Sequence, residues 1–483
     1  AGRVRYGSDE TTTRFDAALG GGIYAVFRER PEISIEADDQ TITYGEKPSL
    51  SVLREGNTKH GDSLAQAIPG VGSAITVKDG GTTVTADANG TAYFDEGTYD
   101  LVTAQVTESA LGYKINNDTT SKTLTVNKRD LLIRANNDAK FSIESQDPAA
   151  FNGITLSGIA EGEKVVVLQE GDTYTDAHGN TVTIDSTTAG KAFLLSGATA
   201  GASVDLQEAT HHEIGTLTLV RKDANNNPTS VNTVGTYVLD LDTVDTAGVA
   251  DSGLELDNYN TTEEAGTFTI VPANELLVTT DGTPEFIYGD TRGYTTSDVD
   301  AEYVNQSVEI TGTDAGVSSG DELIQGSLSG LVVEVTEDTQ NNKTTLKLSN
   351  VTGSGNFQED QAASIDDGST TSTVTIDTAG NAVVDTVPLT DAGGNTFTFD
   401  VGGQTLSFDI AEDKTPDGPS PTVSTPSENL DVGIYNLLAT SVSTGANQVA
   451  SAVNVVGNAR ITPRELTLSA SKVYDGENSA TIT

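Results

Sequence analysis

The sequence predicts an all-β protein made of tandem β-sandwich repeats, with β-rich insertions, arranged as an elongated rod. Three observations predict this class: landmarks that recur along the chain, apolar residues that alternate with polar ones, and a composition rich in Gly, Thr and Asp. Gly and Asp favour turns, and Thr favours half-exposed strands. Helical periodicity is rare, and only Asp62 to Ile68 and Asp321 to Gln325 are expected to form a turn or two of helix.

One recurring landmark is an apolar triple followed by a Tyr-Gly or Tyr-Asp turn, and it opens each unit. It occurs as Ile33-Ser34-Ile35 with Tyr44-Gly45, as Leu276-Leu277-Val278 with Tyr288-Gly289, as Leu466-Thr467-Leu468 with Tyr474-Asp475-Gly476 and, more weakly, as Leu131-Leu132-Ile133 with Phe141. A second landmark leads into the last strand of a unit. It occurs as Gly97-Thr98-Tyr99, Gly235-Thr236-Tyr237 and Gly433-Ile434-Tyr435. Such self-similarity is the signature of a repeat architecture.

The spacing of the landmarks divides each unit into a constant half and a variable half. From closing landmark to next opening triple the distances are 34, 41 and 33 residues (97 to 131, 235 to 276, 433 to 466). From opening triple to closing landmark they are 64, 104 and 157 residues (33 to 97, 131 to 235, 276 to 433). The constant half is typical of a sandwich core, and the variable half of loops or an inserted subdomain.

These distances predict the domain organisation. We expect the end of a preceding domain at 1–32, Ig-like repeats at 33–130, 131–275 and 276–465, and the start of an incomplete fourth repeat at 466–483. The second repeat then carries an insertion of about 40 residues, and the third a large β insertion at roughly 304–430. The joints are short, and Pro272 and Pro463 lie in two of them, which limits bending and favours a semi-stiff rod.

Local patterns also predict strand registers. The segments 396–401 and 404–410, separated by Gly402-Gly403, predict a hairpin that places Phe399 opposite Leu406 and Phe397 opposite Phe408. A second hairpin with the turn Gly80-Gly81 places Val77 opposite Val84. Alternation further predicts one shared face for Leu331, Val333 and Val335, and another for Leu346 and Leu348.

Composition excludes several classes of function. The net charge of −45 disfavours binding to nucleic acid and to anionic lipid. Cysteine is absent, so disulfides, thiolate metal sites and thiol nucleophiles are excluded. No apolar stretch is long enough to cross a membrane, so no membrane insertion is expected in this segment. Because methionine is also absent, we expect Ala1 to follow processing or to lie within a longer protein.

Candidate chemistry is confined to acidic turns and a few isolated motifs. Weak calcium candidates, whose side chains offer the oxygen ligands that calcium prefers, are Asp87, Asn89, Asp172, Asp176, Asp366, Asp367, Asp391 and Asn395. The same residue types are what tight turns require, so a turn is the alternative for each. Neighbours on a strand point to opposite faces, so His211-His212 is not expected to bind metal. Gly316-Val317-Ser318-Ser319-Gly320 matches a nucleophile elbow, but without a following helix we expect a turn.

The landmarks resemble those of a known group of bacterial repeats. The opening triple with Tyr-Gly, the Gly-Thr-Tyr strand and the joint Leu124-Thr125-Val126-Asn127-Lys128 resemble the bacterial Ig-like MBG repeats, and Val473-Tyr474-Asp475-Gly476 resembles the related YDG repeat. Residues 2–25 are similar to the segment that leaves the β-helix in filamentous-haemagglutinin-like exoproteins of two-partner secretion. The resemblance covers most of the chain apart from the insertions. It implies an Ig-like fold and an adhesin of the cell surface.

The sequence therefore favours a structural stalk segment of a secreted bacterial adhesin, acting in attachment, aggregation or biofilm formation, and not an enzyme. No cofactor is expected apart from the calcium candidates. The partner would be a cell-surface or matrix component, such as a polysaccharide, and self-association is also considered. Two alternatives remain open: a subunit of a self-assembling filament or surface layer completed by strand exchange, and a carbohydrate-binding module in the larger insertion.

Overall fold

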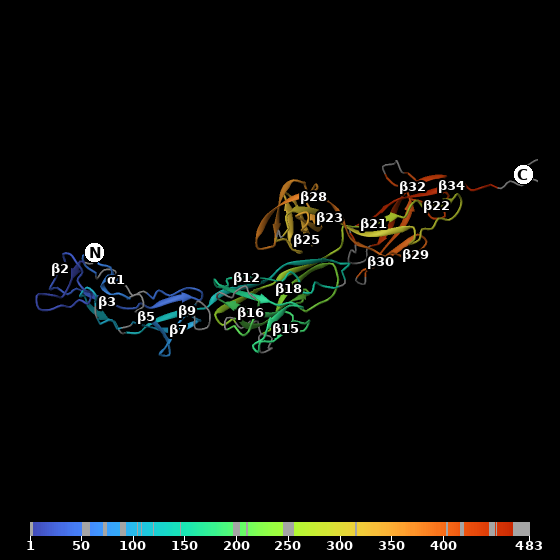
Figure 1. The fold of residues 1–483 in the computed structure, drawn as a ribbon. Helices are drawn as coiled ribbons and strands as arrows, with labels where there is room; N and C mark the ends of the chain where they lie inside the picture. The colour runs from blue at the N-terminus through green and yellow to red at the C-terminus, as the bar shows by residue number, and fades with distance from the viewer. Residues whose placement is uncertain are drawn as a thin grey trace, which may run out of the picture. The chain divides into compact units, whose positions relative to one another are not determined.

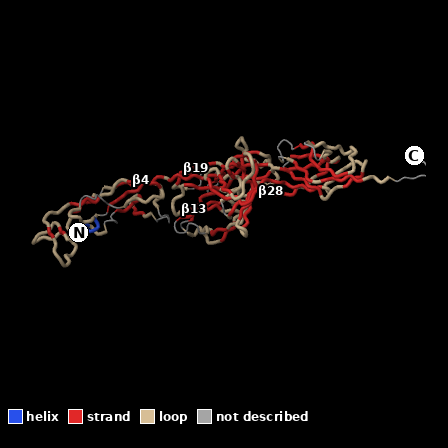
Figure 2. The backbone as a smooth tube through the Cα atoms, turned by 90° about the horizontal axis from the view of Figure 1, so that it is seen from above, coloured by secondary structure: helices blue, strands red, loops and turns tan. Residues whose placement is uncertain are grey.

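The chain is built almost entirely of β-strands. The computed structural model describes all residues except 1–2, 51–57, 71–74, 87–92, 104, 108, 119, 145, 197–202, 209–210, 245–255, 314–315, 402–403, 416–419, 444–449, 451 and 467–483. In the described part, the single helix is α1 (Leu64–Ala67), and the remaining regular structure is strand (Figure 2). The predicted all-β class with tandem Ig-like sandwiches is confirmed, and the strand pairing set out below is its basis.

Two compact units divide the chain. Unit 1 comprises Ala1–Arg134, Ile154–Leu219 and Leu241–Glu264, and unit 2 comprises Ala135–Gly153, Val220–Asp240 and Ala265–Thr483. The boundary falls inside strands β10 (Arg129–Ala135), β17 (His211–Lys222) and β18 (Gly235–Val244). The boundaries at 130, 275 and 465 that the landmark spacing predicts remain predictions.

The first sandwich lies in unit 1 and follows a short N-terminal strand pair (Figure 1). Its strands are β3 (Glu32–Ile35), β4 (Gln40–Thr43), β5 (Ile75–Asp79), β6 (Thr82–Val84), β7 (Gly97–Thr103), β8 (Lys114–Asn117) and β9 (Lys122–Asn127). They are preceded by β1 (Val4–Arg5) and β2 (Ala25–Val26), which pair in parallel. In the β5–β6 hairpin Val77 lies opposite Val84, as predicted.

Helix α1 forms where the sequence predicted a helical turn between Asp62 and Ile68. Ser63 and Gln66 make a reciprocal capping box: the Ser63 hydroxyl accepts from the Gln66 N–H, and the Gln66 side chain accepts from the Ser63 N–H. These bonds satisfy amide groups that a helix of four residues cannot satisfy internally.

The second sandwich contributes strands to both units. Besides β10, β17 and β18, its strands are β11 (Asp138–Phe141), β12 (Ile154–Ser157), β13 (Glu163–Val167), β14 (Thr173–Thr175), β15 (Thr181–Thr183), β16 (Lys191–Ser196), β19 (Tyr259–Glu264) and β20 (Gly266–Val271). Within unit 1, a small apolar cluster centred on Phe193 and Leu195 of β16 packs beneath the β14–β15 hairpin through Tyr174.

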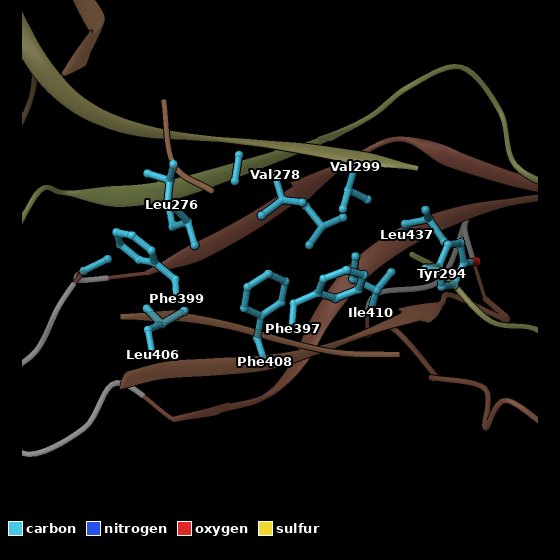
Figure 3. Close-up of a cluster of buried hydrophobic side chains, with 14 of the residues drawn as sticks. Leu276, Val278, Tyr294, Val299, Phe397, Phe399, Leu406, Phe408, Ile410 and Leu437 are labelled. Atoms are coloured by element: carbon cyan, nitrogen blue, oxygen red, sulfur yellow. The ribbon is translucent and has the colours of Figure 1, made fainter. Parts of the chain in front are cut away.

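The third sandwich lies in unit 2. Its strands are β21 (Glu275–Thr280), β22 (Glu285–Ile287), β29 (Thr390–Gly393), β30 (Thr396–Val401), β31 (Gln404–Glu412), β32 (Gly433–Ser443), β33 (Val453–Val456) and β34 (Asn458–Thr462). Its core contains Phe397 opposite Phe408 and Phe399 opposite Leu406, the register that the sequence predicts (Figure 3). Leu276 and Val278 of β21 close this core from the facing sheet.

All three sandwiches share one pairing scheme. The opening strand pairs in parallel with the strand before the last (β3 with β8, β10 with β19, β21 with β33). The short second strand pairs in parallel with the last strand (β4 with β9, β11 with β20, β22 with β34). The strand that begins at the Gly-x-Tyr landmark pairs antiparallel with the last strand (β7, β18 and β32). The repeats deduced from the landmarks are thus equivalent in topology.

Six strands between β22 and β29 form a closed barrel. They are β23 (Val299–Thr311), β24 (Glu322–Gln325), β25 (Leu328–Asp338), β26 (Lys343–Thr352), β27 (Gln361–Asp366) and β28 (Thr371–Thr386). The order β26-β25-β24-β27-β28-β23 returns to β26, so the ring has no free edge. The start of β23 pairs with β21, which attaches the barrel to the third sandwich. Of the stretch 304–430 expected as an insertion, the part up to β28 forms the barrel, and β29–β31 belong to the sandwich sheet.

Two local expectations in the barrel are wrong. Asp321 to Gln325 does not form helix: residues 322–325 are strand β24, which pairs with both β25 and β27. Leu331, Val333 and Val335 do not share one face. A bulge between Val332 and Glu334 reverses the alternation, so Val335 turns to the barrel core while Leu331 and Val333 face outward to a second cluster. Leu346 and Leu348 share the barrel core as predicted.

Candidate functional site: the junctions between domains

Very little chain separates consecutive domains. Lys128 alone lies between β9, the last strand of the first sandwich, and β10, the first strand of the second. Three residues, 272–274, lie between β20 and β21. The side chains beside these joints therefore decide whether they bend.

The first junction, within unit 1, is centred on a carboxylate shared by two tyrosines. Glu163 of β13 accepts a hydrogen bond of 2.5 Å from the Tyr44 hydroxyl and another from the Tyr259 hydroxyl. Tyr44 belongs to the first sandwich and is 1% exposed. The two rings contact edge to face, with centroids 5.4 Å apart. Burial, followed by the hydrogen bond to Glu163, raises the pKa of both tyrosines far above the usual range, so both hydroxyls stay protonated.

Further polar contacts surround this centre. Arg129, the first residue of β10, donates from Nε to the Gly158 carbonyl at 2.6 Å and from Nη1 to the Tyr44 carbonyl at 3.5 Å. Asn258 donates to Asp95 at 3.0 Å and accepts from the Glu96 N–H at 2.7 Å. The first junction is therefore a hydrogen-bonded contact that spans both sandwiches.

The second junction, within unit 2, has an apolar centre. Ala139 and Phe141 of β11 and Val271 of β20 pack against Val333 of β25, which belongs to the barrel. Phe141 is 1% exposed. Burying these side chains stabilises the contact between the outer face of the second sandwich and the barrel.

A buried polar cluster borders the apolar centre. Asp138 accepts from the Ser319 hydroxyl at 2.5 Å and from the Ala139 N–H at 2.7 Å, and its second carboxylate oxygen has no partner in the described part of the chain. Asn152 donates to the Ser319 carbonyl. Burial raises the pKa of Asp138 to about 6, against the opposing hydrogen bonds, and burial likewise raises the pKa of Asp321 to about 6.

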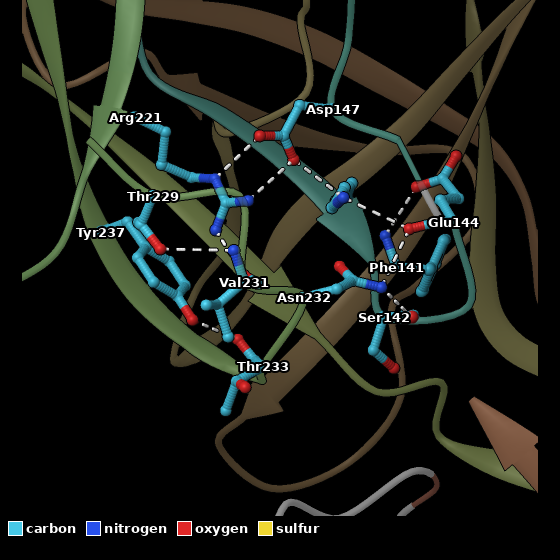
Figure 4. Close-up of polar contacts among 11 residues, drawn as sticks. Phe141, Ser142, Glu144, Asp147, Arg221, Thr229, Val231, Asn232, Thr233 and Tyr237 are labelled. Atoms are coloured by element: carbon cyan, nitrogen blue, oxygen red, sulfur yellow. Dashed lines mark hydrogen bonds and ion pairs between the residues drawn. The ribbon is translucent and has the colours of Figure 1, made fainter. Parts of the chain in front are cut away.

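An ion-pair network holds the loop that follows β11 (Figure 4). Arg221 binds Asp147 through Nε at 2.9 Å and Nη2 at 3.2 Å, and Lys140 binds the same carboxylate at 2.8 Å. The guanidinium lies over the Tyr237 ring at 4.7 Å and near the Phe268 ring at 5.4 Å. The two cations are buried, Asp147 is partly exposed, and their pairing fixes the segment that carries Phe141.

Each closing landmark forms the same tyrosine contact. The hydroxyls of Tyr99, Tyr237 and Tyr435 donate to the carbonyls of Asp95, Thr233 and Asp431 at 3.0, 2.7 and 2.9 Å. In each case the acceptor lies four residues before the tyrosine. This contact resembles the tyrosine corner of Ig-type sandwiches and ties the turn before the strand to the strand itself. It explains why Tyr recurs two residues after Gly.

Five of the calcium candidates accept hydrogen bonds within turns. Asp172 accepts from the Gln169 N–H, Asp176 from the His178 and Asn180 N–H groups, Asp366 from Gly368, Asp367 from Ser369 and Thr370, and Asp391 from Gly393. Asn395 is buried and accepts from the Tyr294 N–H at 3.0 Å. Asp87 and Asn89 lie outside the described residues. Among the residues placed by the structure, no three His, Asp or Glu side chains are grouped for a metal ion. Calcium binding at these turns remains a prediction.

The other motifs lie in structural positions. His211 is buried and accepts from the Asp205 N–H at 2.9 Å, whereas His212 is exposed, as expected for neighbours on a strand. Ser319 and Gly320 form a turn that leads into β24 and not into a helix. Within the described ranges, no helix could span a bilayer.

The shared carboxylate Glu163 and the Asp138–Ser319 contact escape sequence reasoning. The chain has 71 acidic residues, and nothing local distinguishes these two. The partners of Glu163 lie 119 and 96 residues away. Arg129 could have been noticed, because it directly follows the Leu-Thr-Val-Asn-Lys joint.

Comparison with known proteins yields distant structural likeness only. No family model matches the chain, and no curated protein matches it. The human desmocollin-1 ectodomain is 10% identical, with 93% of this chain and 84% of that chain covered, at a TM-score of 0.13. Eight N-terminal Ig domains of DSCAM are 8% identical (82% and 48% covered, TM-score 0.10), and domains 1–6 of the surface layer protein SbsC are 13% identical (80% and 64% covered, TM-score 0.10). Scores of this size carry no argument about function.

Proposed function

We propose that this chain is a structural stalk segment of a secreted bacterial adhesin that acts in attachment, aggregation or biofilm formation at the cell surface. The observation that carries the proposal is the construction of the junctions. Both join consecutive domains by packed side chains beside a joint of one to three residues. Such joints restrict the angle between neighbouring domains. A stalk that projects from a cell surface requires this restriction, and domains joined by flexible linkers lack it.

Composition and topology support the same role. A net charge of −45 keeps an extended fibre soluble. Serial sandwiches with equivalent pairing give a stability that is approximately a sum over units and interfaces. The bound partner would be a cell-surface or matrix component, such as a polysaccharide.

Intact mass and electron microscopy of the native secreted material test the proposal. A polypeptide much larger than 50.1 kDa, seen as a thin rod with beads, is the expected result. A polypeptide near 50.1 kDa polymerised into a regular filament would contradict the stalk and favour a self-assembling subunit.

A deletion tests the biological role. Removal of residues 33–275 in frame from the native protein should shorten the fibre and reduce attachment of the producing cells to a surface. The control is Glu161→Ala, which removes an exposed side chain and leaves the junctions intact. Unchanged attachment by cells that display the shortened fibre would count against a stalk function.

A further inference from the structure

Three equivalent turns follow the short second strands of the sandwiches. In each, the residue after the strand donates its N–H to the last strand: Tyr44 to Asn127, Ser142 to Val271 and Tyr288 to Thr462, at 2.8, 2.8 and 2.9 Å. Two residues later, the N–H groups of Glu46, Glu144 and Asp290 donate back to Thr43, Phe141 and Ile287 at 2.9, 3.1 and 3.0 Å. Tyr44, Ser142 and Tyr288 therefore occupy one structural position.

This position is covered by the next domain in the first two sandwiches. Tyr44 is 1% exposed beneath Glu163 and Tyr259 of the second sandwich, and Ala160 lies beside the adjacent Gly45. Ser142 is also buried, and the adjacent Phe141 lies beneath Val333 of the barrel. In both cases the turn is part of the contact surface of a junction.

Tyr288 in the third sandwich is uncovered. It is 41% exposed, and its hydroxyl has no hydrogen-bond partner among the residues that the structure places. The arginine contact of the first junction, however, is also present at Tyr288. Arg464 donates from Nε to the Tyr288 carbonyl at 2.8 Å and pairs with Asp290, just as Arg129 donates to the Tyr44 carbonyl. Gly45 and Gly289 lie beside these two arginines in the same way.

Exposed apolar side chains lie on the sheet face beside Tyr288, on either side of Arg460 and Thr462 of β34. Ile287 of β22 and Ile434 of β32 are 48% and 57% exposed, and Val432, directly before β32, is 54% exposed. At the positions of Ile287 and Ile434, the first sandwich carries Thr43 and Thr98. The second carries Phe141, which the barrel covers, and Thr236. Exposed apolar side chains grouped on one sheet face mark an interaction surface.

We propose that Tyr288 and the Ile287–Val432–Ile434 face are the docking surface for a further sandwich of this kind, which presents a carboxylate to the Tyr288 hydroxyl. The partner chemistry follows from the covered examples: an acidic side chain in the position of Glu163 and an apolar side chain in the position of Val333. This assignment depends on the junction geometry alone and holds whether or not the fibre is an adhesin.

Tyrosine nitration tests whether the surface is covered. The native secreted protein and the isolated 483-residue chain are treated with tetranitromethane, and the modified positions are mapped by peptide mass spectrometry. In the isolated chain, Tyr288 should react at least about tenfold faster than Tyr44, because Tyr44 reacts only after local opening. In the native protein, Tyr288 should be protected to the level of Tyr44. Equal reactivity of Tyr288 in both samples would overturn the proposal.

Photo-crosslinking identifies what covers it. p-Benzoylphenylalanine at position 288 of the native protein should crosslink to a peptide from another β-sandwich, close to an Asp or Glu. The same substitution at Val442, an exposed residue elsewhere on β32, is the matched control and should give no such product. A crosslink from position 288 to a glycan or to a protein without a sandwich fold would overturn the assignment.

Discussion

The first junction of this chain is polar at its centre, whereas the second is apolar at its centre and polar at its border. At the first, one carboxylate, Glu163, joins two tyrosine hydroxyls. At the second, Phe141, Val271 and Val333 form the contact. Asp138 is buried beside it, and one of its oxygens has no partner among the described residues. Two solutions to the same structural problem are therefore present in one chain.

The two junctions are held by different interactions: directional hydrogen bonds at the first and apolar contact at the second. A carboxylate shared by two hydroxyls fixes direction, because both hydrogen bonds require a particular geometry. Apolar contact supplies more free energy but constrains direction less, since it depends mainly on the area removed from water. Substitutions at the two centres should therefore differ in magnitude, and pH should act on the two junctions in different ranges.

The largest effect is expected for Phe141→Ala at the second junction. Removal of a fully buried aromatic ring, with the cavity it leaves, should lower the free energy of unfolding of unit 2 by about 3–5 kcal/mol. Urea denaturation combined with hydrogen exchange at β11 and β20 measures this. Ile434→Ala, on an exposed residue, should cost less than about 0.5 kcal/mol in the isolated chain. Similar losses for the two variants would show that the apolar centre does not hold the junction.

A somewhat smaller effect is expected for Glu163→Ala at the first junction. Two buried tyrosine hydroxyls would lose their acceptor, at a cost of about 2–4 kcal/mol. Hydrogen exchange at β4 and β13 reports the loss where it occurs, and Glu163→Gln should recover part of it by offering one amide oxygen. Glu161→Ala, two residues away, is the control, because its side chain is exposed. Equal hydrogen exchange in the Glu163→Ala and Glu161→Ala variants would show that the shared carboxylate does not stabilise the first junction.

The sequence predicts structure that depends on residues close together in the chain, and it misses structure that depends on contacts between residues far apart in the chain. Hairpin registers such as Phe397 with Phe408 follow from alternation and a two-residue turn, and both are short-range. The bulge beside Val333 has no local signal, and it decides which residues face the second sandwich. Residues 322–325 become strand because β25 and β27 pair on both sides, which overrides local propensity. Barrel closure through β23 and β26 is likewise a long-range event.

The candidate site shows the same division. The recurring Tyr-Gly turns mark Tyr44 and Tyr288 as landmarks, but whether each side chain is covered depends on a domain elsewhere in the chain. Glu163 is one of 71 acidic residues, and only the fold brings it to Tyr44. The recurring Gly-x-Tyr pattern was predictable, and its cause, a hydroxyl that binds a carbonyl four residues earlier, was visible only in the structure.

Mild acid should strengthen the second junction. Burial holds the pKa of Asp138 and Asp321 at about 6, above the value of 3.8 for the unfolded chain. Their contribution to stability is therefore complete below about pH 4 and is lost as the pH rises through 6. Glu144 and Asp147 act on Asp138 from its own segment, and their negative charge raises its pKa further. Asp366 at the end of β27, Asp367 after it, and Asp138 itself act on Asp321 in the same direction.

The measurement is the difference between wild type and Asp138→Asn. Through Asp138 alone, wild-type unit 2 should lose roughly 2–3 kcal/mol between pH 4 and pH 7.5. Asp138→Asn should lose less over that range, because the amide does not ionise. Parallel pH profiles for the two proteins would contradict a titrating carboxyl at this junction. The first junction has no corresponding step there, since its raised tyrosine pKa values place the loss above pH 10.

The smallest effect is expected inside the sandwiches, at the tyrosine contacts of the closing landmarks. Tyr435→Phe removes one hydrogen bond to the Asp431 carbonyl and keeps the ring, which should cost about 1 kcal/mol. Tyr99→Phe should cost a similar amount, because its bond to the Asp95 carbonyl has the same geometry. Urea denaturation of both variants checks this.

Comparing these two variants tests whether the stability of a sandwich depends on its junction with the next domain. Tyr99 lies in a sandwich whose junction turn is covered, and Tyr435 in one whose turn is exposed at Tyr288. If each sandwich contributes its own stability and each junction adds a separate term, the two losses should agree within about 0.5 kcal/mol. A much larger loss for Tyr99→Phe would mean that the first junction transmits strain into the sandwich core, and the polar contact at Glu163 would then be part of the fold of the repeat as well as its connection.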